Sequence, residues 1–144
     1  MNIGFIGVAG ALAFAAIGSA LGMGAAGMAA VGAWKKCFAQ NKPAPFTMVI
    51  FAGAPLTQTI YGFILMNRLI IAAESSLDPA LLLGAGVLGG IAMGFSAWFQ
   101  GRAGAGASDA LAETGKGFVN YILVVGLIET IALFVMVFLL GVVS

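Results

Sequence analysis

A single carboxylate lies in the middle of the most apolar stretch of this sequence. The stretch VGLIETIALFVMVFLL, from Val125 to Leu140, is apolar except for Glu129 and Thr130. A carboxylate in such surroundings holds a proton, pairs with a donor or binds a cation, whereas on a soluble helix it simply faces water. The composition of the chain decides between these alternatives.

The composition is that of a membrane protein. Of the 144 residues, 62% are hydrophobic and only 8% are charged, and the mean hydropathy is +1.12. Each of four apolar runs exceeds the ~20 residues that cross a bilayer as a helix. The sequence contains no His and no nucleotide-binding Gly-Lys-Ser/Thr motif, which argues against soluble enzymology. The expected transmembrane helices cover residues 3–33, 46–73, 80–107 and 118–143.

The expected depth of Glu129 excludes the soluble-helix alternative. Glu129 lies 11 residues after Phe118 and 14 before Val143, and Gln58 lies 12 residues after Phe46, so both are expected near mid-membrane. A bare charge there costs from ~3 to more than ~10 kcal/mol. Glu129 must therefore be protonated, paired or bound to a cation. A protonated Glu129 with a purely structural role is one alternative.

Neutral oxygen donors accompany this carboxylate. Pro55 has no N–H, so it frees the carbonyl of Phe51 and loosens the turn around Ala54. Alkali cations are held by oxygen ligands that replace their hydration shell, whereas a proton needs only the carboxylate. The polar side chains expected near the same depth are Thr57, Gln58 and Tyr61 on the second helix and Gln100 on the third.

Two stretches recur within the chain. PLTQTIYGF (55–63) aligns with GLIETIALF (126–134), which places Gln58 opposite Glu129, and GSALGMGAAG (18–27) aligns with FSAWFQGRAG (95–104). The offsets are 71 and 77 residues, respectively. The repeat predicts two tandem helical hairpins in the same orientation, residues 1–73 and 74–144, the second of which carries the carboxylate.

Glycine is unevenly divided between the expected helices. The first and third hold 16 of the 22 glycines. Small residues four apart, such as Gly18 and Gly22, allow close helix packing. We therefore expect the first and third helices to form an inner layer with the second and fourth outside; one compact four-helix bundle is the alternative.

The basic residues predict the orientation in the membrane. Five of them lie in or beside the first and third connections, and Arg68 is expected to reach the opposite interface. Both termini should therefore face the extracytoplasmic side, and the loops 34–45 and 108–117 the cytoplasm. The five are Lys35, Lys36, Lys42, Arg102 and Lys116.

The double hairpin, PLTQTIYGF, FSAWFQGRAGAG and LIETIAL together resemble the ring-forming proteolipid, also called the K or c subunit, of V-type and bacterial A/V-type rotary ATPases. The resemblance implies an all-α, multi-pass protein of the cell membrane that forms a homo-oligomeric ring, turns against a stator subunit bearing an arginine, and seats a central stalk on its cytoplasmic loops. It also implies that ATP chemistry happens on other subunits and that no organic cofactor is bound. One Na⁺ per copy would be held by Thr57, Gln58, Gln100, Glu129 and the Ala54 carbonyl, with Tyr61 bonded to Glu129 and Pro55 in support.

Three alternatives remain at this point. The same rotor could carry H⁺ in place of Na⁺, because Glu129 alone suffices for a proton. A small four-helix, proton-coupled antiporter would also use an intramembrane acid, although it would place that acid beside aromatic residues lining a cavity. A non-transporting structural proteolipid explains the glycines but leaves Gln58, Gln100 and Glu129 without a role.

Overall fold

The computed structural model describes residues 3–75 and 77–144, and the regular structure within them is entirely helical. Four segments are long and apolar enough to cross a membrane, and the second of them, Met48–Glu74, is interrupted by a short 3₁₀ turn. The expected all-α class with four candidate spans is thus confirmed. The elements are α1 (Gly4–Ala39), α2 (Met48–Gly53), η1 (Ala54–Leu56), α3 (Thr57–Glu74), α4 (Pro79–Thr114) and α5 (Phe118–Val142).

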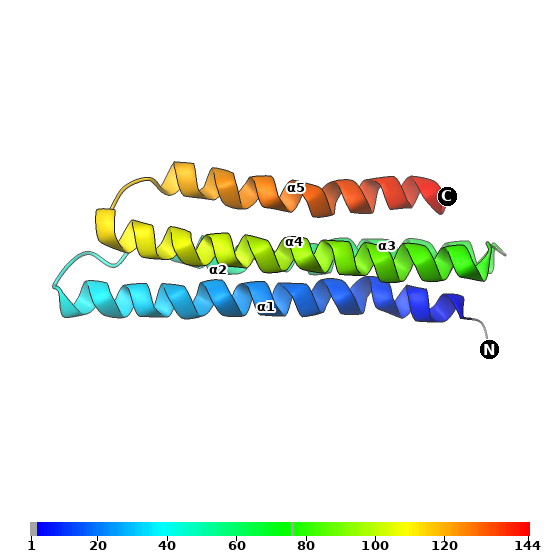
Figure 1. The fold of residues 1–144 in the computed structure, drawn as a ribbon, viewed down its shortest axis with the longest axis horizontal. Helices are drawn as coiled ribbons and strands as arrows, with labels where there is room; N and C mark the ends of the chain where they lie inside the picture. The colour runs from blue at the N-terminus through cyan, green and yellow to red at the C-terminus, as the bar shows by residue number, and fades with distance from the viewer. Residues whose placement is uncertain (1–2, 76) are drawn as a thin grey trace.

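The helices form an elongated bundle (Figure 1). Both termini lie at one end, together with the connection between α3 and α4, and the other two connections lie at the opposite end. α1 and α4 have 36 residues each, or about 54 Å at ~1.5 Å per residue. They are therefore longer than a bilayer core requires.

Local sequence explains where α4 begins and ends. The Asp78 carboxylate accepts a hydrogen bond from the Ala80 N–H at 2.8 Å, and Pro79 occupies the first turn, where its missing N–H is not needed. Gly115 follows the helix with a φ of 64°, a left-handed conformation that favours glycine. The reversal into α5 is completed by Gly117, whose φ is 89°.

Two details expected from the sequence are wrong. The predicted loops 34–45 and 108–117 are partly helical, because α1 continues to Ala39 and α4 to Thr114. Arg102 does not lie beside the third connection: it is 12 residues before the end of α4, with its guanidinium 5.8 Å from the Phe99 ring centroid. The physical reason is that a helix does not end where its apolar run ends, since polar and charged residues continue it well.

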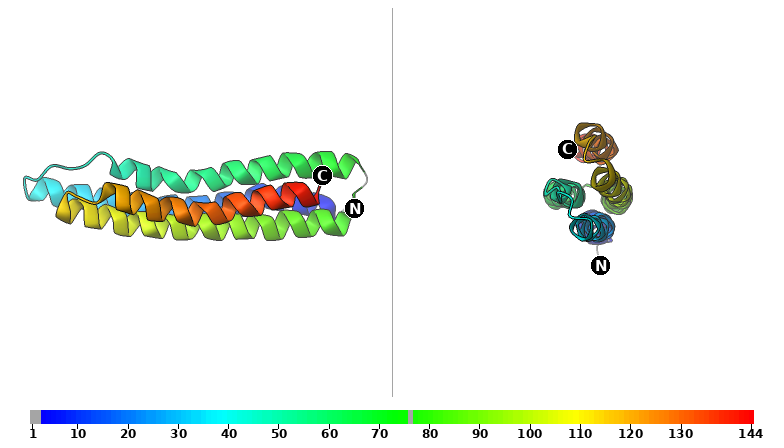
Figure 2. Two further views of the ribbon diagram at one scale, coloured as in Figure 1. Left: turned by 90° about the horizontal axis from the view of Figure 1, so that it is seen from above. Right: turned by 90° about the vertical axis from the view of Figure 1, so that its left-hand side faces the viewer.

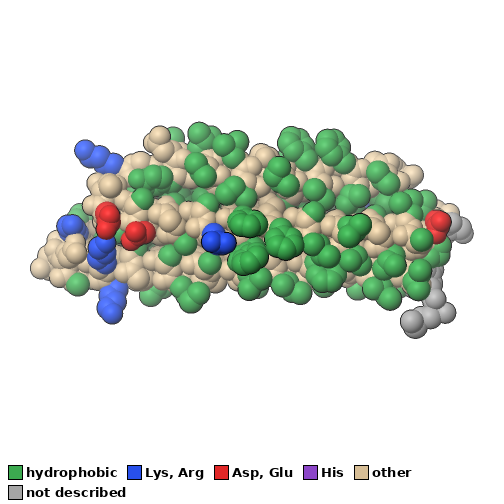
Figure 3. Space-filling view, viewed as in Figure 1, with side chains coloured by type: hydrophobic (Ala, Val, Ile, Leu, Met, Phe, Trp, Pro, Cys, Tyr) green, Lys and Arg blue, Asp and Glu red, His purple; other side chains and the backbone are tan. Residues whose placement is uncertain are grey.

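Charged side chains nevertheless gather at one end of the bundle. On the face drawn in Figure 3, most basic side chains lie at the end that holds residues 40–47 and 115–117, and hydrophobic side chains are spread along the rest of the bundle. At this end the Lys36 ammonium pairs with the Glu113 carboxylate at 2.6 Å. The pair joins the ends of α1 and α4.

The most extensive helix contact is between α1 and α4. A Cβ atom at Gly18 would overlap the backbone of Gly94, and one at Gly101 would overlap the backbone of Gly22. α3 packs on both α1 and α4, and α5 packs on α4 and α3, as the end-on view in Figure 2 illustrates. The close approach expected of the first and third spans is therefore present within one chain. The ring itself stays a prediction.

Candidate ion-binding site

The first part of the site lies at the helix break around Pro55. The α-helical pattern stops at Gly53, passes through the 3₁₀ turn and resumes at Thr57, because Pro55 cannot donate the hydrogen bond of a regular turn. The Ala54 carbonyl accepts a hydrogen bond from the Thr57 hydroxyl at 3.0 Å. The expected distortion around Ala54 thus orients a carbonyl oxygen and a hydroxyl oxygen together.

Two buried amides extend this group toward α4. The Thr57 hydroxyl lies 3.1 Å from Gln58 Oε1, and Gln58 Nε2 donates to Gln100 Oε1 at 2.9 Å. Both glutamine side chains are fully buried (0% exposed), where an unpaired amide would cost several kcal/mol. Their direct bond joins the two hairpins at the predicted depth.

Glu129 ends the network on α5. Its Oε1 accepts a hydrogen bond from the Tyr61 hydroxyl at 2.8 Å, and its Oε2 accepts one from Gln100 Nε2 at 3.0 Å. Glu129 is half-buried, 11 residues after Phe118 and 13 before Val142, so it sits near the middle of the span. Every site residue predicted from the sequence therefore belongs to, or directly shapes, one connected group.

Two members of this group were not predicted as site residues. The Ser96 hydroxyl donates to the Ile128 carbonyl at 2.9 Å and lies 3.4 Å from Gln58 Nε2. The Val125 carbonyl accepts from Gln100 Nε2 at 3.1 Å. The repeat contains a signal for Ser96, since its Ser-Ala pair recurs in both hairpins, but a carbonyl such as that of Val125 leaves no signal in the sequence.

The chemistry of the group is that of oxygen ligands around one carboxylate. Among residues 3–75 and 77–144, no three His, Cys, Asp or Glu side chains gather as a multivalent metal site would require. A single carboxylate with neutral carbonyl, hydroxyl and amide oxygens balances one positive charge. The arrangement suits a monovalent cation or a proton.

Comparison with known proteins gives two similarities over the spans described above. Residues 83–140, which cover most of α4 and α5, match the family model for the C subunit of ATP synthase. The chain is also similar to a subunit of an A-type ATP synthase. It is 33% identical over 146 residues to the A-type ATP synthase subunit K of Methanocaldococcus jannaschii, an alignment that covers 94% of this chain and 63% of that protein. The chain thus spans less than two thirds of the length of this relative.

Proposed function

We propose that the chain is the rotor-ring subunit of an A- or V-type ATPase and that each copy carries one Na⁺ at Glu129. The observation that carries the proposal is the mid-span Glu129 carboxylate, joined through Gln100 and Gln58 to the Thr57 hydroxyl and the Ala54 carbonyl. A proton-only site would not require this series of neutral oxygens. Burying them in a bilayer is costly unless they are used.

Sodium loading has a specific requirement in this geometry. In the arrangement described, the Gln100 amide presents its nitrogen to the Glu129 carboxylate. A cation between these two groups needs an oxygen there instead, so the Gln100 amide turns by about 180°, which exchanges its Oε1 and Nε2. The Gln58 amide turns with it, because its Nε2 now donates to Gln100 Oε1 and would otherwise face the Gln100 nitrogen. The Tyr61 hydroxyl continues to orient the carboxylate from the other side.

The proposed cycle follows from placing many such sites on a ring. The ring turns against a stator membrane subunit whose arginine displaces the ion from each Glu129 in turn, while ATP chemistry occurs on other subunits. Moving one ion against 100 mV costs ~2.3 kcal/mol. The basic end of the bundle faces the cytoplasm and seats the central stalk, and both termini are extracytoplasmic in this multi-pass protein of the cell membrane.

Carbodiimide labelling of Glu129 tests the ion. The reagent attacks the protonated acid, so bound sodium should slow labelling of the parent protein across the pH range, whereas choline at equal ionic strength should not. Glu129→Gln lacks the reactive carboxylate and therefore gives the background level of labelling. Sodium protection should fade in Gln58→Leu and Gln100→Leu. Equal labelling of the parent at every sodium concentration would overturn the sodium assignment and favour the same rotor coupled to H⁺.

Native mass measurement in mild detergent tests the rotor. The parent should form closed rings of many copies. A population of monomers and dimers alone would overturn the rotor proposal. It would favour a small antiporter or a structural proteolipid instead.

A further inference from the structure

One face of α1 has no partner among the residues that the structure describes. Under the 77-residue repeat, its exposed residues are equivalent to the α4 residues that pack directly on α1. Because the equivalent α4 residues contact α1, the repeat predicts that this face of α1 contacts the inner helix of another hairpin in the same way. The pairs are Ala9 with Gly86, Ala13 with Gly90, Ile17 with Gly94, Ala20 with Ala97 and Gly24 with Gly101.

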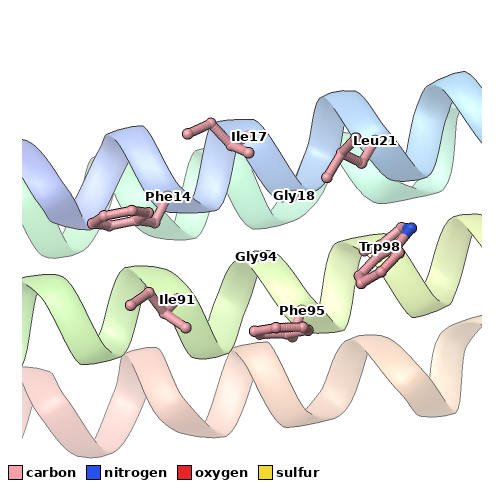
Figure 4. A pocket seen from close by; sticks show the side chains of 8 residues that line it. All are labelled: Phe14, Ile17, Gly18, Leu21, Ile91, Gly94, Phe95 and Trp98. Atoms are coloured by element: carbon pink, nitrogen blue, oxygen red, sulfur yellow. The ribbon is translucent and has the colours of Figure 1, made fainter.

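The outer face of α4 has the complementary property. Gly18 and Gly22 of α1 meet α4 within the chain, and their equivalents on α4 are Phe95 and Phe99, which are 52% and 48% exposed. Figure 4 shows Gly18 and Gly94 facing each other across the seam, with Phe95 alongside. The side of α4 that should meet a neighbouring hairpin therefore presents phenylalanines where α1 presents glycines.

The outer helices α2 and α5 also indicate that the second hairpin lacks a neighbour that the first hairpin has. Met48, Phe51 and Pro55 of the first hairpin are fully buried, because α1 and the α4 helix of the second hairpin both pack on this segment. Under the 71-residue repeat their equivalents are Val119, Ile122 and Gly126, which line an open hollow on α5; Val119 is 74% exposed. Nothing in the described part of the second hairpin covers this hollow, whereas its counterpart is covered.

We infer that a second copy of this chain docks its α1 on α4 and α5 of the first, with Phe99 packed against Gly24 of the next copy and Phe95 against Ile17 of the next copy. The inference rests on the proposed ring and defines its interface. A Cβ atom at Gly24 meets nothing within 4 Å in the chain, so there is space for the Phe99 ring. Each ring would then alternate a backbone-to-backbone seam inside a copy with a phenylalanine-filled seam between copies.

The seam between copies should hold no second ion site. At the position equivalent to Gln100 the first hairpin has Met23, and at the position equivalent to Tyr61 the second has Ala132. The interface between copies therefore lacks the amide and the hydroxyl that hold the carboxylate within a copy. The interface would therefore hold neighbouring copies together without binding an ion.

Disulfide crosslinking tests the interface. In a Cys37→Ser background, which removes the natural thiol, Phe99→Cys combined with Gly24→Cys should give a ladder of oxidised multimers up to the full ring, and a reductant should collapse it. The control pair is Phe99→Cys with Ile60→Cys, because Ile60 is 51% exposed on the outer helix α3. This pair should give no ladder.

The outcomes separate the interface from the rotor proposal. Parent rings with no ladder from the Phe99 and Gly24 pair would overturn the interface alone. Absence of rings from the parent protein would overturn the rotor proposal and the interface with it. Gly24→Leu gives a second measurement: the single chain should insert normally and ring yield should fall at least tenfold, and rings at the parent yield would overturn the interface.

Discussion

The two hairpins share one scaffold but differ at equivalent positions near mid-span. Where the second has Glu129, Gln100 and Phe99, the first has Gln58, Met23 and Gly22. A serine is shared, as Ser96 and Ser19, but its surroundings differ. The Ser96 hydroxyl is bonded to Ile128, whereas the Ser19 hydroxyl is buried without a hydrogen-bond partner among the described residues.

The comparison teaches that duplication has divided the work. The first hairpin supplies only neutral groups to the proposed site, together with a flat glycine surface for close packing. The second supplies the Glu129 carboxylate and the Gln100 amide, and bulky aromatic side chains on its exposed side. Exchanging residues between equivalent positions tests this division directly. We expect the effects to decrease in the order given below.

Glu129→Gln copies the residue of the first hairpin into the second. Ion transport by vesicles reconstituted with the complete ATPase should be abolished, because an amide cannot balance the charge of a cation or carry a proton. The matched control is the neighbouring Thr130→Val, since the Thr130 hydroxyl bonds to the Leu127 carbonyl of its own helix and transport should persist. Measurable ion flux through Glu129→Gln would contradict a role for this carboxylate as carrier.

Gly22→Phe copies Phe99 into the first hairpin. A Cβ atom at Gly22 already overlaps the Ala97 carbonyl, so the ring should force α1 from α4 and destabilise the chain by about 3 kcal/mol or more. Thermal unfolding in detergent measures this loss. Gly32→Phe is the control, because a Cβ there meets nothing within 4 Å. Equal stability of Gly22→Phe and the parent would disprove the close α1–α4 contact.

Gln100→Met copies Met23 into the second hairpin at similar volume. It removes the bonds to Gln58 and Glu129, worth roughly 1–3 kcal/mol where the partners stay buried. Sodium affinity, measured as the concentration that halves carbodiimide labelling, should weaken by about 10- to 100-fold. Proton coupling should be retained. Unchanged sodium protection would show that Gln100 is not a ligand.

The two serines provide the smallest contrast. Ser96→Ala removes the hydrogen bond that the Ser96 hydroxyl donates to the Ile128 carbonyl and should cost about 1 kcal/mol of unfolding free energy. Ser19→Ala removes a hydroxyl that has no described partner and should be neutral or slightly stabilising. The midpoints of thermal unfolding of the two variants, compared in one detergent, measure the difference. A larger loss for Ser19→Ala would reverse this part of the comparison.

Much of the fold and site could be predicted because a bilayer makes polar residues costly. Four apolar runs left little choice of topology, and Glu129, Gln58 and Gln100 stood out because each needs a partner at that depth. Pro55 likewise marked the helix break from its own chemistry. All of these signals are local in sequence.

The remaining details depend on where helices end and on how they face each other. Hydropathy ended the third span at residue 107 and therefore placed Arg102 near a connection, yet α4 continues to Thr114. The sequence indicated that Gly18 and Gly22 allow close packing, but it did not show which side of α1 contacts α4 within the chain: Gly22 is packed, but Gly24, two residues away, is open. Whether a glycine is packed depends on the direction in which it faces around the helix axis. The repeat identified the free face of α1 only after the face that contacts α4 was known.

The glycine seam between α1 and α4 also bears on how many ions the proposed rotor carries in each revolution. Because the backbones touch at Gly18, Gly22, Gly94 and Gly101, the hairpins of one copy do not separate without losing their main contact. A ring then grows by four helices at a time and gains one carboxylate with each step. At a given circumference it transports half as many ions per revolution as a ring with one carboxylate per hairpin. At a fixed number of ATP molecules per revolution, more free energy is therefore available per ion, which would suit the proposed rotor to pumping against a steep gradient.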